Sequence, residues 1–314
     1  MVTFGESYLP GNVFLATSMW DNASAISNEG IEFEAQYDVI RKKNWNWSVG
    51  FNLSHNKNML RKTYNGEDLN DKVLGRPVYG IYTFKDEGIV QKEEDIPMYP
   101  NASGKQIPLY FQSINNPLRV GGRKIKDQNY DGVIDDKDLY YAGSTLPAVY
   151  GGLNSHLEWK GLSFDVLFSY TISRKVMNMY KNSAFTFTKD FGVIMNYFHA
   201  NDFWTTSNRD AKYPSLEFAD KDYVGQFDGN VDSNIENISF LRLKQLVIGY
   251  QLPKNWLKGS FIKDANIYLS GENLFLITNY SGVDPEVINP YSGKDDGTQY
   301  PLNRKVTLGL NLKF

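Results

Sequence analysis

Residues 29–40 read EGIEFEAQYDVI, and apolar and polar side chains alternate along the whole stretch. After a polar turn at 41–44, the alternation restarts in residues 45–54, WNWSVGFNLS. Successive side chains of a β-strand point to opposite faces, so each segment would have one apolar and one polar face. The pattern predicts a β-hairpin whose two faces differ in polarity.

The same two-faced segment recurs along the chain. Strands are predicted at 149–159 and 162–172 around the short turn Lys160-Gly161, and then at 237–252, 265–277 and 304–314. A weaker first strand is expected near 12–19, which gives about eight strands. The phase of 240–252 is ambiguous, because Arg242 and Lys244 share the parity of Leu246. We expect this basic pair to lie above the apolar band.

The connections between the strands differ at the two ends of the predicted sheet. The turns after 40 and 159 are short, whereas the linkers 60–148, 173–236 and 278–303 are long and all fall on one side. Short turns on one side and long loops on the other are typical of an outer-membrane barrel. The fold class predicted is therefore all-β, an antiparallel transmembrane β-barrel segment with long extracellular loops. Four aromatic residues map to the short-turn end, as in the aromatic belt at a membrane–water interface: Trp45, Trp159, Trp256 and the C-terminal Phe314. The alternative is that they are ordinary strand-end residues of a soluble sandwich.

Composition narrows the function. The 33 Lys and Arg against 36 Asp and Glu give a net charge of -3, so no electrostatic argument favours nucleic acid. The chain has 0 Cys, which excludes disulfides, thiolate metal sites and a Cys nucleophile. The sequence has no G-x-S-x-G, P-loop or H-E-x-x-H motif, and its three His are scattered. We therefore predict no catalytic residue and no enzyme.

One motif is compatible with metal binding. Residues 127–138, DQNYDGVIDDKD, match the calcium-loop pattern D-x-[DN]-x-[DN]-G, with a Gly at the sixth position that permits a sharp turn. The twelfth residue is Asp rather than Glu, and the flanks do not look helical. The alternative is an Asx-rich turn without an ion. The predicted ligands of one Ca²⁺ are Asp127, Asn129, Asp131, the Val133 carbonyl, Asp135 and Asp138.

The order of several short motifs along the chain resembles one known family. The motifs are NEGIEF at 28–33, the D-x-N-x-D-G-x-I-D loop followed by YGGL at 150–153, SFLRLK at 239–244, SGENLF at 270–275, DPE at 284–286 and a terminal Phe314. Together they resemble the C-terminal β-barrel part of SusC/RagA-type TonB-dependent outer-membrane transporters of the Bacteroidetes.

The resemblance implies a large plugged barrel in the cell outer membrane that imports glycan fragments or oligopeptides. Its implied partners are TonB, acting through a plug domain, and a SusD-like lipoprotein at the extracellular mouth. We expect residues 1–314 to be a truncated barrel without signal peptide, TonB box or plug, which would not transport alone. Two alternatives stay open: a small complete outer-membrane barrel with a structural or adhesive role, and a secreted β-sandwich binding module.

Substrate contacts are expected from the long loops and the polar side of the strands. Several aromatic residues of the 173–236 linker could stack on sugar rings, although we favour packing of the loop on itself or on the lipoprotein. They are Phe185, Phe187, Tyr197, Phe203 and Trp204.

Overall fold

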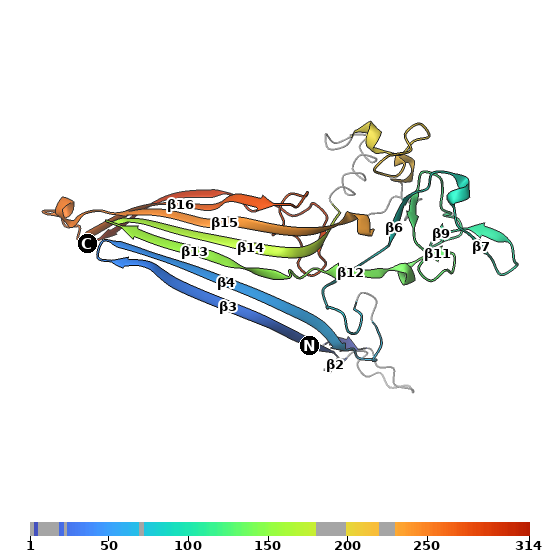
Figure 1. Cartoon of the computed structure of the whole chain (residues 1–314), viewed down its shortest axis with the longest axis horizontal. Coiled ribbons are helices and arrows are strands. Elements are labelled where there is room, and N and C mark those ends of the chain that lie inside the picture. The colour runs from blue at the N-terminus through green and yellow to red at the C-terminus, as the bar shows by residue number, and fades with distance from the viewer. Residues whose placement is uncertain (1–2, 6–18, 22–23, 69–71, 180–198, 220–229) are drawn as a thin grey trace.

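A single long antiparallel sheet dominates the computed structural model, which describes residues 3–5, 19–21, 24–68, 72–179, 199–219 and 230–314 (Figure 1). The strands of this main sheet lie in the order β18-β16-β15-β14-β13-β4-β3, and a two-residue strand, β17, pairs with β14. Their bounds are β3 Ala25–Lys42, β4 Trp45–Lys62, β13 Val149–Trp159, β14 Leu162–Asn178, β15 Ile235–Gln251, β16 Asp264–Thr278, β17 Lys294–Asp295 and β18 Lys305–Lys313. The all-β antiparallel fold predicted from the sequence is confirmed.

The strand register gives the sheet two chemically different faces. Residues that are directly opposite in adjacent strands share a face, so each cross-strand row can be followed from β3 to β18. The middle row of the apolar face contains Tyr37, Val49, Ser155, Val166, Leu246, Gly271 and Val306. The adjacent row of the polar face contains Asp38, Ser48, His156, Asp165, Val247, Ser270 and Thr307. We use "apolar face" and "polar face" for these two sides below.

The apolar face is solvent-exposed in this chain. Ile31 and Tyr37 are each 69% exposed and Leu308 is 75% exposed, although all three occupy regular strand positions. A soluble β-sandwich would cover such a face with a second sheet. No second sheet packs on it in the described part of the chain. The sandwich alternative is therefore not supported.

The expectation that the basic pair lies above the apolar band is wrong for Arg242, because a β-bulge interrupts β15. The registers of β14–β15 and β15–β16 both shift next to Lys244, so Leu243 pairs with Phe168 while Arg242 pairs with Ser169. An extra residue moves all following side chains to the opposite face. Arg242 therefore lies on the polar face and is buried, rather than above the apolar band.

The two ends of the main sheet differ as predicted. The β3–β4 and β13–β14 turns, the β15–β16 connection and the C-terminus lie at one end, whereas the long linkers lie at the other (Figure 1). The β15–β16 connection contains the 3-10 turn η7 (Lys254–Leu257). The predicted belt residues occupy this end: Trp45 is directly opposite Trp159, and the Phe314 ring stacks on Phe261 with centroids 5.5 Å apart.

Strands β3, β4, β14 and β15 continue well past the ~9–11 residues that cross a bilayer. The linkers beyond them form short two-stranded sheets: β5 (Gly80–Thr83) with β12 (Tyr140–Ser144), β6 (Asp86–Ile89) with β10 (Arg123–Ile125), β7 (Met98–Pro100) with β8 (Gln106–Pro108), and β9 (Tyr110–Phe111) with β11 (Val133–Ile134). The remaining 3-10 turns are η1 (Glu93–Asp95), η2 (Asp136–Asp138), η3 (Ala200–Asp202), η4 (Leu216–Ala219) and η6 (Asp232–Asn234).

This loop region has a core of its own. Val90, Leu109, Phe111 and Ile134 are buried together with Val231 from the next long linker. Asp232 then ties the two linkers, because its carboxylate accepts hydrogen bonds from the Lys85 ammonium at 2.6 Å and from the Tyr140 hydroxyl at 2.8 Å. Burial raises the pKa of Asp232, but these donors outweigh burial and hold the pKa below its usual range. The long loops are therefore a packed module rather than loose connections.

The main sheet does not close on itself. In the described residues β3 pairs only with β4, and β18 only with β16, so the sheet has two open edges. An open edge in lipid leaves unpaired N–H and C=O groups, each costing several kcal/mol. A small complete barrel would pair its first and last strands, which is not seen here. Of the weak strand expected near 12–19, residues 12–18 lie outside the described residues. Met19 begins β2 (Met19–Asp21), which pairs with β1 (Thr3–Gly5).

Among the described residues, no helix is both long enough and apolar enough to cross a membrane.

Candidate functional site

The polar face is the candidate site, because it carries hydrogen-bonding groups along the full length of the sheet. On its central strands, His156 Nδ1 lies 2.5 Å from Asp165 Oδ1, and at the β18 edge the Lys305 ammonium lies 3.4 Å from Glu272. These ion pairs are about half exposed, so they contribute little to stability. A row of accessible carboxylates, amides and lysines is suited to binding a polar molecule rather than to forming a core.

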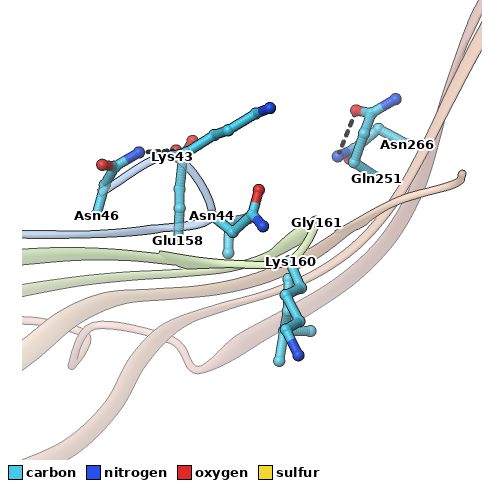
Figure 2. Close-up of a pocket in the computed structure, with 10 residues that line it drawn as sticks. Lys43, Asn44, Asn46, Glu158, Lys160, Gly161, Gln251 and Asn266 are labelled. Atoms are coloured by element: carbon cyan, nitrogen blue, oxygen red, sulfur yellow. Dashed lines mark hydrogen bonds between the residues drawn. The ribbon is translucent and has the colours of Figure 1, made fainter. Parts of the chain in front are cut away.

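At the short-turn end, the polar face is hollowed into a cavity of about 390 Å³. Figure 2 shows amide side chains on two sides of it, and Asn266 donates to the Gln251 amide oxygen at 3.4 Å. The Lys160 side chain points away from the side on which Gln251 lies. The lining residues are Lys43, Asn44, Asn46, Glu158, Lys160, Gly161, Leu162, Ser163, Gln251 and Asn266. Amides that both donate and accept suit a polypeptide backbone better than a single ion.

At the long-loop end, the polar face is covered by the 278–303 linker. Arg242 Nη2 contacts Asp284 Oδ1 at 2.5 Å, and both side chains are 4% exposed. Arg242 also contacts Glu286, whose carboxylate accepts from the Lys244 ammonium at 2.8 Å. Asp284 Oδ2 accepts the Leu302 N–H at 3.1 Å. The bulge on β15 thus places two cations against two carboxylates of the same loop.

A second buried arginine fixes the same loop. Arg174 donates to the carbonyl oxygens of Thr145, Pro285 and Ile288 at 3.0, 3.3 and 3.4 Å. Beside it, Tyr280 donates to the Asp295 carboxylate, and burial first, then this carboxylate, raises the pKa of the Tyr280 hydroxyl. The loop is therefore held on the polar face by two strand arginines. Sequence reasoning missed this cluster, although the isolated Asp284-Pro285-Glu286 and Arg242–Lys244 pairs carried a signal.

The predicted calcium loop folds as a network of carboxylate-capped turns. Asp127 accepts the N–H groups of Tyr130 and Gly132 at 2.6 and 2.8 Å, and Asp138 accepts those of Gln128 and Asp135 at 2.7 and 2.9 Å. Burial holds the pKa of Asp138 above its ordinary value, although these hydrogen bonds act in the opposite direction. Gly132 has φ +83°, as a tight turn at the sixth position requires.

The other predicted ligands lie at the loop surface. Asp131 accepts the Val133 N–H at 3.0 Å and the Asn129 amide at 2.9 Å, and Asp135 accepts the Lys137 N–H at 2.8 Å. The Lys137 ammonium lies 3.5 Å from Asp135 and 3.9 Å from Asp131. Within the described ranges, no group of three or more acidic or His side chains is arranged to hold a metal ion. The calcium site stays a prediction, and the arrangement without an ion is an Asx-turn network.

Calcium binding can be tested by titrating the protein with calcium. Because backbone N–H groups already occupy the carboxylate oxygens, we expect weak affinity, about 10⁻⁴–10⁻³ M as in extracellular calcium modules. Asp131→Ala should abolish the calorimetric signal and increase hydrogen exchange in 120–145. The control Glu94→Ala, which changes an exposed carboxylate outside the loop, should retain binding. No heat at millimolar calcium would leave only the Asx-turn interpretation.

Two of the linker aromatics that sequence analysis singled out are buried. Trp204 donates to the Gln91 amide oxygen at 3.0 Å, and the Phe203 ring lies 5.8 Å from the Tyr213 ring. Phe203 and Trp204 therefore pack the loop module, as the favoured interpretation expected, and are not free to stack on a sugar. Phe185, Phe187 and Tyr197 lie outside the described residues.

Comparison with known proteins points to one kind of protein. No family model matches the chain. TonB-dependent receptor P26 of Formosa agariphila is 29% identical over 95% of this chain, and TonB-dependent receptor SusC of Bacteroides thetaiotaomicron is 25% identical over 98%. A structure of the RagAB peptide transporter superposes on 95% of this chain with a TM-score of 0.66 at 22% identity.

The chain spans about 30% of the length of the curated relatives it matches and 30% of the RagAB chain. The RagAB similarity shows the fold, and in sequence the chain is similar to TonB-dependent receptors including SusC. The resemblance to SusC/RagA-type receptors predicted from the sequence is confirmed.

Proposed function

We propose that this chain, a relative of the SusC/RagA-type TonB-dependent receptors, forms part of the barrel wall of an outer-membrane importer. The observation that carries the proposal is the two-faced open sheet. Its apolar face is exposed over successive cross-strand rows, and its opposite face is polar. Lipid would cover the apolar face, and a water-filled lumen would solvate the polar face. The open edges of β3 and β18 then pair with strands outside this chain.

The two ends of the polar face suggest different partners. The amide-lined cavity at the short-turn end would contact a plug domain in the lumen, through which TonB acts. The packed loop module at the other end would meet a SusD-like lipoprotein at the extracellular mouth. The substrate would be a glycan fragment or an oligopeptide, bound by hydrogen bonds to the polar face and the loops. The accessible groups described here suit binding and passage rather than catalysis, so we propose no enzymatic role.

An uptake assay with matched variants tests this role. Asn154 and Leu153 are neighbours on β13, but Asn154 lies on the polar face over Gly50, and Leu153 pairs with Phe168 on the apolar face. In the full-length transporter, Asn154→Trp should reduce uptake of labelled oligosaccharide and oligopeptide mixtures severalfold by narrowing the lumen. Leu153→Trp should retain it, since the indole meets lipid.

A tonB deletion should abolish uptake in cells with the unmodified transporter. Equal uptake by the two Trp variants, or uptake that persists without TonB, would contradict the proposal.

A further inference from the structure

A second cavity lies where the wall of the sheet is interrupted beside the loop module. Strand β13 starts at Val149, so beyond Ser54, the partner of Tyr150, β4 has no β13 neighbour. Here the segment leading into β13 lies between β4 and β14. A cavity of about 290 Å³ is left between this segment and the two strands. The lining residues are His55, Asn56, Lys57, Asn58, Pro77, Ser144, Leu146, Pro147, Ala148, Ser173 and Lys175.

All three basic residues of this cavity belong to the apolar side of the sheet. His55 is the cross-strand partner of Ile31, and Lys57 is the partner of Glu29, both of which follow the parity of Phe33 and Tyr37. Lys175 follows a register shift that turns Arg174 inward, so that Lys175 itself faces outward. The cavity therefore has its charged groups on the side that would face lipid, not the lumen.

The height of these residues matches the headgroup layer. His55 is level with Ile31, an exposed residue of the apolar face, and Lys57 lies two residues further, roughly 7 Å along a strand. For a strand tilted by ~45°, Lys57 is roughly 5 Å above the row of Ile31, within the polar layer of a bilayer, which is about 5–8 Å thick. Basic side chains at this height attract anionic headgroups.

The hydrogen bonds leave donors available in the cavity. His55 Nδ1 lies 2.6 Å from the Ala148 carbonyl oxygen, which can only accept, so Nδ1 donates to it and the available donors come from the two lysines. The Lys175 ammonium donates to the Ala142 carbonyl at 2.6 Å, which uses one of its three N–H groups. In the described residues Lys57 has no ion-pair partner, and Glu29 pairs with Arg61 at 3.4 Å. Among the residues that the structure describes, no carboxylate lines the cavity, and Pro77, Leu146 and Pro147 make part of its wall apolar.

We propose that this cavity binds the phosphate of an outer-leaflet glycolipid. Cations beside an apolar wall, at the height where phosphate and acyl chain meet, fit an amphipathic phosphorylated glycolipid better than a free anion. The proposal rests on the proposed outer-membrane location. Its consequence is a specific lipid contact at the junction of the barrel wall and the loop module.

Binding to the full-length transporter in nanodiscs tests the proposal. The probe is monophosphorylated lipid A, compared with the same glycolipid without its phosphate and with inorganic phosphate. The double variant Lys57→Gln/Lys175→Gln should bind the phosphorylated glycolipid about tenfold more weakly, because two charge-assisted contacts are lost. The control Lys254→Gln/Lys258→Gln, which removes the same charge at the short-turn end outside both cavities, should bind like the unmodified protein.

Equal binding of the glycolipid without phosphate would overturn the proposal, as would equal losses in both double variants. Binding of inorganic phosphate as tight as that of the glycolipid would indicate a free-phosphate site and would also overturn it. The measurement does not depend on uptake, so a failed uptake assay leaves this result interpretable.

Discussion

Arg242→Met is expected to lower the free energy of unfolding by about 3–5 kcal/mol, because it leaves the buried Asp284 carboxylate without its cation, whereas Glu286 keeps Lys244. The effect should be centred on the 278–303 linker, which this arginine holds on the polar face. Urea unfolding of the protein in lipid vesicles measures the loss, and hydrogen exchange over 279–303 locates it.

The matched control is Lys305→Met, which removes a cation from an exposed pair with Glu272 on the same face. Exposed pairs contribute about 0–1 kcal/mol, so this variant should change little. The double variant Arg242→Met/Asp284→Asn should lose less stability than Arg242→Met alone, because the buried carboxylate is removed with its cation and Lys244 keeps Glu286. Unchanged exchange in Arg242→Met would mean that water already solvates the two carboxylates.

The regular part of this fold was predictable because strand periodicity depends on adjacent residues alone. The alternation in 29–40 and 304–314 identifies the face of Ile31 and of Leu308, and both assignments agree with the register. The order of short and long connections likewise predicts which end carries the loops, because strand direction reverses at each turn.

The bulge on β15 was not predictable in the same way. A single inserted residue, Lys244, reverses the parity of all that follows, and a period-two pattern read across it gives the wrong face for Arg242. The partner of Arg242 is Asp284, 42 residues away, in a linker without periodicity. The candidate site was therefore predicted as a polar face, but its buried ion-pair cluster and its cavity at the short-turn end depend on contacts that the local sequence does not encode.

Val166→Arg is expected to cost about 2–4 kcal/mol of folding free energy in a bilayer, because it would place a charge in lipid near mid-depth. Val166 lies in the middle row of the apolar face, between Ser155 on β13 and Leu246 on β15. With Tyr37, Val49 and Phe168 it lines a shallow apolar hollow that acyl chains can fill. Reversible urea unfolding in vesicles of defined phosphatidylcholine measures the cost.

Gln245→Arg is the matched control at the same depth. Gln245 is exposed and pairs with Leu167, the residue after Val166, but on the polar face, where the new guanidinium would stay in water. It is a cleaner control than Asp165→Arg, which would also break the hydrogen bond to His156. Gln245→Arg should cost under about 1 kcal/mol. Equal costs for Val166→Arg and Gln245→Arg would show that the two faces meet the same solvent, and the assignment of the apolar face to lipid would then be wrong.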